Sequence, residues 1–164
     1  MIVLGIDPGL ATMGWGVLNN NKGSFQTMDY GVVLTPKEET LPVRLAMLEE
    51  GVNKLVEKYN PEEIALEELF FNSNITTGIN VAQARGVILL TCVKKCGRLF
   101  EYTPLQIKQA LTGYGRADKR QMQIMVKTLL KLDSIPRPDD AADALAVAIT
   151  HCQTNRLAAP FGIR

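Results

Sequence analysis

Short apolar runs separated by turn residues occupy the beginning of the chain, a pattern typical of strands joined by hairpins. Residues 3–6 form an apolar run that ends in Asp7-Pro8-Gly9, and residues 15–18 form a second run that ends in a turn rich in Asn and Gly. Residues 25–34 are the third predicted strand. Because short turns join all three strands, we expect an antiparallel meander.

The rest of the chain carries apolar residues mainly at helical spacing. The predicted helices span residues 41–59, 73–96, 104–111, 119–131 and 139–153, and the predicted strands span residues 64–69 and 99–102. Hairpin-linked strands followed by alternating helices and strands predict an α/β fold, with a five-stranded mixed sheet and helices on both faces. Ribonuclease-H-like proteins and actin-like ATPases share this layout, so the fold alone does not decide the function.

Length and composition indicate an ordinary globular protein. The 164 residues, 46% hydrophobic and 21% charged, predict a single domain over residues 1–164, with a loose tail from about residue 154. No apolar run approaches the roughly 20 residues that cross a bilayer. The first residues are typical of a core strand rather than a signal peptide. We therefore expect a cytoplasmic protein without membrane association.

The three cysteines, Cys92, Cys96 and Cys152, fit that compartment, because an odd number gives no disulfide framework. A zinc site that also uses His151 is an alternative. However, adjacent residues on a helix point about 100° apart, which suits shared zinc ligation poorly. Buried thiols are the preferred interpretation.

Charge is distributed unevenly along the sequence. Residues 1–68 carry 5 Lys and Arg against 11 Asp and Glu, whereas residues 69–164 carry 13 against 6. Acidic surface suits cations and basic surface suits phosphates, although scattered surface charge is the alternative explanation.

Four acids stand where an apolar core residue would be expected. Asp7 closes the first apolar run, Glu67 follows an apolar run of its own, and Asp140 and Asp143 begin an alanine-rich helix. Residues at i and i+3 lie on one helix face, and small alanines let that helix lie close to a sheet. The helix should bring both aspartates to the strand ends that carry Asp7 and Glu67.

Clustered ionised carboxylates repel one another, and divalent metal ions remove that repulsion. All-oxygen ligands favour Mg²⁺ or Mn²⁺ over zinc. Glu67 and Glu68 compete for one place in the cluster, because neighbouring strand residues point to opposite faces. The spacing does not choose between these two glutamates.

Each acid also has a plain structural interpretation. Asp7 fits a turn, Asp139 and Asp140 fit helix caps, and Glu67 and Glu68 fit a solvated strand end. Asp143 resists such an explanation, because it stands inside an apolar helix. Together, the four acids favour a metal site.

The motifs around these acids resemble the RuvC family of Holliday-junction resolvases, in the family's order and over nearly the whole chain to about residue 153. The motifs are Gly5-Ile6-Asp7-Pro8-Gly9, Ala65-Leu66-Glu67-Glu68-Leu69-Phe70, Gln83-Ala84-Arg85-Gly86 and Asp140-Ala141-Ala142-Asp143-Ala144-Leu145-Ala146. Residues 106–109 and 125–130 are also similar. The resemblance implies a ribonuclease-H-like fold.

The resemblance further implies a homodimeric crossover junction endodeoxyribonuclease that nicks two opposed strands of four-way DNA, leaving 5′-phosphate and 3′-hydroxyl ends. Its catalytic and metal-binding acids would be Asp7, Glu67, Asp140 and Asp143, which selects Glu67 over Glu68. These acids would hold two Mg²⁺ ions, with Mn²⁺ able to substitute. The family also suggests cooperation with the RuvA–RuvB branch-migration complex.

Further residues are expected to contact DNA. Phe70 matches the family's junction-contacting aromatic, where stacking on a base is worth about 1–3 kcal/mol; burial of Phe70 or Phe71 in the core is the alternative. Lys108 and Lys119 resemble the family's DNA-contacting lysines.

Arg116 and Arg120 are additional candidate phosphate contacts. The family suggests that the helix at 75–96 helps to form the dimer, but its apolar stripe does not distinguish a dimer face from the core.

Three competing functions follow from the same features. Gly5-Ile6-Asp7-Pro8-Gly9 resembles the phosphate-binding hairpin of an actin-like ATPase or sugar kinase, although such proteins usually need two domains of this kind. A non-catalytic junction-binding protein is the second alternative. The third is a ribonuclease-H-like nuclease that acts on another substrate, such as an RNA–DNA hybrid.

Overall fold

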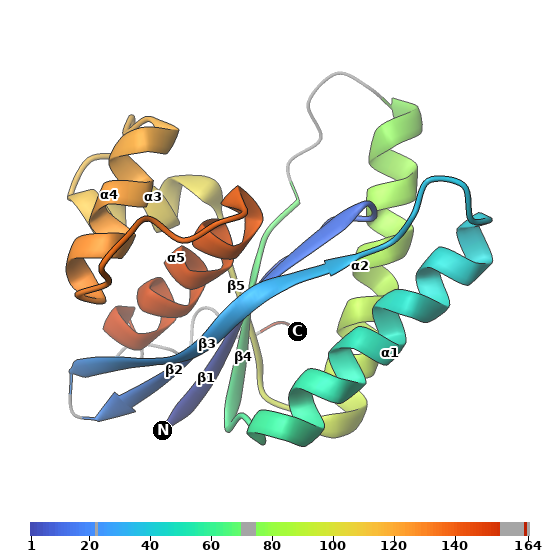
Figure 1. Cartoon of the computed structure of the whole chain (residues 1–164), viewed down its shortest axis with the longest axis horizontal. Coiled ribbons are helices and arrows are strands. Elements are labelled where there is room, and N and C mark those ends of the chain that lie inside the picture. The colour runs from blue at the N-terminus through green and yellow to red at the C-terminus, as the bar shows by residue number, and fades with distance from the viewer. Residues whose placement is uncertain (22, 70–74, 155–162, 164) are drawn as a thin grey trace.

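A central mixed sheet organises the protein, seen in a computed structural model that describes residues 1–21, 23–69, 75–154 and 163 (Figure 1). The strands are β1 (Ile2–Asp7), β2 (Thr12–Asn21), β3 (Ser24–Leu34), β4 (Glu63–Glu67) and β5 (Leu99–Tyr102). Their order in the sheet is β3-β2-β1-β4-β5. The β1–β2 and β2–β3 pairs are antiparallel, and the β1–β4 and β4–β5 pairs are parallel. The predicted antiparallel meander is therefore the first part of this sheet.

Helices cover both faces of the sheet. They are α1 (Leu41–Tyr59), α2 (Ile75–Lys95), α3 (Pro104–Thr112), α4 (Lys119–Leu129) and α5 (Asp139–Thr154). Helices α1 and α2 lie on one face, and α3, α4 and α5 lie on the other (Figure 1). This arrangement confirms the predicted fold class.

Two predicted strands have wrong boundaries. The second strand spans Thr12–Asn21, longer at both ends than the predicted 15–18, because β2 pairs with β3 over its whole length. The strand predicted to reach Leu69 ends at Glu67, since its neighbour β5 ends at Tyr102, directly opposite Glu67. A strand without a partner beyond that point has no ladder to continue.

Alternation along the strands divides the core into two apolar layers. Val3 and Ala65 belong to the layer beneath α3, α4 and α5. Ile6, Ile64 and Leu66 belong to the layer beneath α1 and α2. Because successive side chains of a strand point to opposite faces, residues two positions apart belong to the same layer.

Helix α5 lies unusually close to β1 and β2, because glycines face it. A Cβ atom at Gly5 would collide with the backbone carbonyl of Ala144, and a Cβ atom at Gly14 would collide with that of Asp140. The alanines of α5 are the other half of this contact, since Ala144 and Ala148 are fully buried. Small residues on both sides thus fix the height of the helix above the sheet.

Helix α2 buries only one of its apolar stripes. Ala84 and Ile88 are fully buried against the α1 side, whereas Ile79, Leu90 and Val93 are 53%, 54% and 50% exposed. The apolar stripe predicted for this helix includes Ile79, Ala82, Gly86, Leu89 and Val93. Most of it is exposed, although Leu89 is half-buried and packs against the layer beneath α1 and α2.

Two of the three cysteines, Cys92 and Cys152, are buried as predicted, whereas Cys96 is half-buried. Cys92 lies in the layer beneath α1 and α2, and Cys152 lies in the layer beneath α5, so these two thiols do not share a zinc site. All three cysteines are free, and burial raises the pKa of Cys92 and of Cys152 to about 12. Among the described residues, no helix is both long and apolar enough to cross a membrane.

Candidate active site

Asp7 and Glu67 are the last residues of two adjacent parallel strands. The register pairs Gly5 with Ala65 and Ile6 with Leu66, so the two acids follow in step at the same edge of the sheet. Gly5 and Ala65 face α5, and residues two positions further along a strand face the same way. Glu67 therefore shares the α5 face with Asp7, which supports the choice of Glu67 over Glu68.

Helix α5 places two more acids above these strand ends. Gly14 is paired with Asp7 across β1 and β2, and the backbone of Asp140 packs directly on Gly14. Asp143 lies one turn further along the same helix face. The first turn of α5 also favours acids, because the positive end of the helix dipole lies there.

The electrostatics of the acids show that they interact. Burial raises the pKa of Asp7 to about 8, and the charges of Glu67, Asp143 and Asp140 add to this rise. Burial also raises the pKa of Glu67 to about 7, with a further contribution from Asp143. The pKa of Asp143 is raised by burial as well, against the opposing effect of Lys119. A shared positive charge would relieve all three of these acids.

Lys119 is the cation closest to this cluster. Its Nζ lies 3.3 Å from Asp139 Oδ2 and 3.4 Å from Asp143 Oδ2. Asp118 caps α4 by accepting a hydrogen bond of 2.8 Å from the Gln121 backbone, which fixes Lys119 in the first turn. Burial lowers the pKa of Lys119, but Asp143 and Asp139 together hold it above its ordinary value. Lys119, predicted as a DNA contact, is therefore also an ion-pair partner of the acids.

Asp139 is a member of the site that the sequence identified only as a cap. It bonds to Lys119 and also to the guanidinium of Arg137. Its position in the acidic first turn of α5 is the sequence feature that could have marked it as a site residue. Sequence spacing alone does not reveal that Lys119 of α4 lies next to it.

A cavity of about 220 Å³ opens beside the acids. Its polar walls are Glu67, Lys108, Lys119 and Asp143. Its apolar walls come from α3, α4 and α5, namely Pro104, Ile107, Met122 and Ala146. A lining that combines two acids with two lysines suits a phosphate group held next to a cation.

The donor set fits a hard divalent cation, since every candidate ligand is a carboxylate oxygen. The side chains do not yet converge: among the described residues, no three His, Cys, Asp or Glu side chains are grouped as a bound metal ion requires. Mutual repulsion and the pairing of Asp143 with Lys119 explain this spread. The raised pKa values of Asp7 and Glu67 show that the nearby lysines only partly offset the cost of burying and clustering these acids.

Of the remaining predicted DNA contacts, Lys108 is among the described residues that line this cavity. Lys108 on α3 is half-buried, while Arg116, before α4, and Arg120, on α4, are exposed. Phe70 and Phe71 lie outside the described residues, so their environment stays a prediction.

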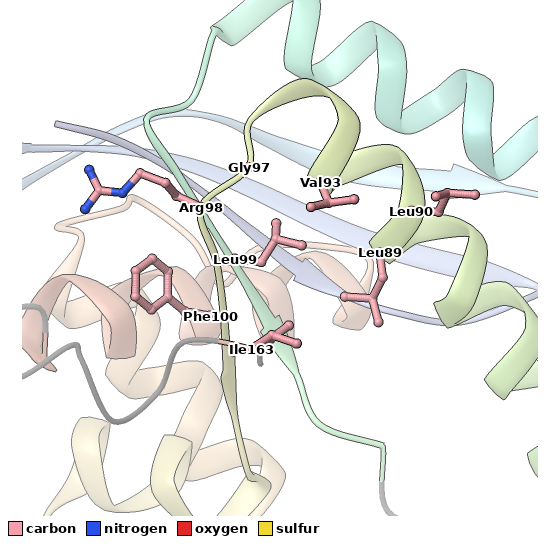
Figure 2. A pocket seen from close by; sticks show the side chains of 8 residues that line it. All are labelled: Leu89, Leu90, Val93, Gly97, Arg98, Leu99, Phe100 and Ile163. Carbon is pink, nitrogen blue, oxygen red and sulfur yellow. The ribbon is translucent and has the colours of Figure 1, made fainter.

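A larger cavity, of about 440 Å³, lies between α2 and β5 (Figure 2). Its described lining is mostly apolar and includes none of the four acids. Leu89, Leu90, Val93 and Phe100 line it, and Arg98 is its charged residue. The described residues that line it include no carboxylate or nucleophile, so it is not the candidate for chemistry.

His151 is buried in a separate polar network. Its Nε2 lies 2.7 Å from Glu63 Oε2, and its Nδ1 lies 2.7 Å from the hydroxyl of Tyr102. With both ring nitrogens engaged, His151 is not available to a zinc ion. The sequence did not indicate this network.

Known proteins can be compared with this fold and site. The family model for crossover junction endodeoxyribonuclease RuvC matches residues 3–151. A protein of that name from Rubrobacter xylanophilus is 54% identical over 162 residues, covering 99% of this chain and 90% of the relative. Its namesake from Alkaliphilus oremlandii is 49% identical over 164 residues, covering 100% of both.

Solved structures agree with the sequence matches. The structure of Thermus thermophilus RuvC superimposes with a TM-score of 0.89 at 34% identity, covering 99% of this chain and 100% of that one. T. thermophilus RuvC in complex with a Holliday junction substrate gives the same TM-score and coverage at 31% identity. The resemblance of the motifs is thereby confirmed, and the chain belongs to the RuvC family of crossover junction endodeoxyribonucleases.

Proposed function

We propose that this chain is a Mg²⁺-dependent endonuclease that resolves Holliday junctions through paired, symmetric nicks. One observation carries the proposal: Asp7, Glu67, Asp140 and Asp143 come from β1, β4 and α5 to one edge of the sheet, beside a cavity with two lysines. The T. thermophilus RuvC complex with a Holliday junction substrate supports the choice of DNA.

The four acids would hold two Mg²⁺ ions, and Mn²⁺ would substitute because it accepts the same oxygen ligands. Bound metal supplies a nucleophilic water at neutral pH and stabilises the charge on the leaving oxygen. Cleavage of the P–O3′ bond by water then gives a 5′-phosphate and a 3′-hydroxyl. Asp7 and Glu67 must lose their protons first, because raised pKa values keep them partly protonated near neutral pH.

The basic residues would position the DNA backbone. Lys108 and Lys119 line the cavity that contains Glu67, so a phosphate bound there would lie next to the acids. Arg116, before α4, and Arg120, on α4, are both exposed and would extend this contact along the DNA strand. Phe70, three residues after Glu67 in the sequence, would stack on an unpaired base at the crossover.

Symmetric nicking requires two active sites related by a two-fold axis. We assign the pairing surface to the exposed apolar side of α2, which carries Ile79, Leu90 and Val93. A monomer with so many exposed apolar residues on one helix is expected to cover them with a second copy. From the family resemblance we also propose a cytoplasmic location and cooperation with the RuvA–RuvB complex.

The test is cleavage of a labelled four-way junction against a linear duplex of the same sequence, in Mg²⁺ and in EDTA. We expect symmetric, ligatable nicks in the junction alone, abolished by EDTA. Tight junction binding without nicking would replace the proposal with a non-catalytic binding protein. Preferential cleavage of an RNA–DNA hybrid would replace the proposed substrate, and ATP hydrolysis by the pure chain would favour the actin-like alternative.

A further inference from the structure

A second group of charges lies on the α2 face of the sheet, behind the acids. Arg85 of α2 forms an ion pair with Glu101 of β5, and these side chains are only 20% and 23% exposed. Glu101 is paired with Leu66 in the register of β4 and β5. The ion pair therefore lies level with Leu66, one residue before Glu67, on the face of the sheet opposite the proposed active site.

The guanidinium of Arg85 is poorly satisfied for a buried group. Its Nε is buried and has no hydrogen-bond partner among the described residues. Burial lowers the pKa of Arg85, whereas the charge of Glu68 raises it. A cavity of about 250 Å³ lies at this point, lined by Glu68, Leu69, Ala82, Arg85 and Glu101. Arg85 thus stands between an acid on β5 and the acid that follows Glu67.

The end of β4 needs such support. Glu67 is the last residue of the strand, and its partner β5 also ends there. Beyond it, the Glu68 backbone N–H donates a single hydrogen bond of 2.9 Å to the Tyr102 carbonyl. Strand ends open at lower free energy than strand centres. A carboxylate that must meet a metal ion therefore sits at the least constrained point of its own strand.

We propose that Arg85 is a positioning residue for Glu67: its ion pair with Glu101, formed beside Glu68 in the same cavity, ties the carboxyl end of β4 to β5 and to α2. This inference rests on the proposed nuclease function. Arg85 acts from the α2 face, so it does not touch the scissile phosphate. Because α2 also carries the exposed apolar side, the same residue links the proposed pairing helix to the catalytic strand.

Stability alone does not explain a half-satisfied buried arginine. Replacing a buried ion pair with apolar groups of similar volume is often neutral or stabilising. Arg85→Met keeps much of the alkyl chain and removes the charge, so it separates positioning from packing. Arg85→Lys keeps the charge but loses the planar fork, and it should recover part of the effect.

The experiment measures three quantities on the full chain: single-turnover cleavage of a four-way junction at saturating protein, junction Kd in Ca²⁺, and the Mg²⁺ concentration that gives half the maximal rate. For Arg85→Met we expect a cleavage rate at least tenfold lower and a half-saturating Mg²⁺ concentration severalfold higher. Junction Kd should stay within twofold of wild type. Arg85→Lys should lie between the two, and Glu101→Gln should reproduce the loss from the β5 side.

Lys95→Met is the matched control, because Lys95 also lies on α2 and pairs with an acid, Glu57, at 3.1 Å. It should change neither the rate nor the Mg²⁺ requirement. Cleavage by Arg85→Met and Glu101→Gln within twofold of wild type would overturn the inference. So would an equal loss of binding and cleavage, which would make Arg85 a DNA contact. Wild-type protein that fails to cleave would overturn the proposed function instead.

Discussion

The two ends of β4 carry one acid each, four residues apart on the same face of the sheet, with Glu63 buried and Glu67 half-buried. Glu63, at the beginning, is only 2% exposed and is fully partnered. Arg98 contacts its Oε1 at 2.8 Å, and His151 contacts its Oε2 at 2.7 Å. Glu67, at the other end, forms no ion pair with any residue that the structure describes, and burial raises its pKa to about 7.

The difference separates an acid that stabilises the fold from an acid that awaits a ligand. Burial lowers the pKa of His151, so the neutral ring can donate to Glu63 from Nε2 and accept from the Tyr102 hydroxyl at Nδ1. Every group in that network has a partner. A buried acid that lacks one is costly to ionise. Burial alone therefore does not mark a functional acid, whereas partial burial without an ion-pair partner does.

The largest expected effect comes from Glu67→Gln. We expect junction cleavage to fall roughly 1,000-fold, equivalent to about 4 kcal/mol in the transition state, because a metal ligand is lost. Junction binding and thermal stability should be retained. Single-turnover cleavage, binding in Ca²⁺ and a melting curve measure the three properties. Cleavage within tenfold of wild type would remove Glu67 from the site.

Glu63→Ala should show the reverse behaviour. It leaves the buried His151 Nε2 and one end of Arg98 without an acceptor, which we expect to cost about 2–4 kcal/mol of unfolding free energy. The melting temperature should fall by roughly 5–15 °C. Urea denaturation measures the loss, with Glu67→Ala as the matched variant on the same strand. If Glu67→Ala were the more destabilising of the two, the contrast between the two ends would be wrong.

The sequence indicated Asp7, Glu67, Asp140 and Asp143, because each acid interrupts an apolar element at a place where the fold class brings strand and helix ends together. It did not indicate which acids have partners. Glu63 and His151 are 88 positions apart, and their contact depends on the register of β4 beneath α5. Periodicity does not encode such registers, nor the approach of Lys119 to Asp143.

A smaller effect concerns pH in the absence of metal. The pKa values of Asp7 and Glu67 are raised to about 8 and 7, so the folded protein holds protons that the unfolded chain has already released above about pH 4–5. In EDTA, the free energy of unfolding should therefore fall as pH rises from about 5 to 8, because the folded protein must release these protons and the unfolded chain has none to release.

Asp7→Asn should flatten that slope, and excess Mg²⁺ should abolish it in the wild type. Urea denaturation at several pH values measures both. A wild-type slope unaffected by either change would show that these acids are not the uncompensated ones.

The smallest expected effect belongs to Lys119→Ala. Its exposed ammonium should contribute a single phosphate contact, so junction affinity should fall by about three- to tenfold and the salt dependence of log Kd by about one. Salt titrations of junction binding measure both quantities. Arg98→Ala, an exposed cation paired with the opposite end of β4, is the control and should leave the salt slope unchanged. An unaltered salt slope for Lys119→Ala would exclude a phosphate contact and leave Lys119 only as the ion-pair partner of Asp139 and Asp143.

The close packing of α5 on Gly5 and Gly14 has a consequence for which mutations abolish activity. A single added methyl group at either codon would lift the helix that carries Asp140 and Asp143, while leaving every carboxylate in place in the gene. A screen for loss of recombination should therefore return glycine and alanine codons alongside the acidic ones. Lineages that accumulate larger side chains at these glycines and alanines would lose the nuclease activity although all four acids are unchanged.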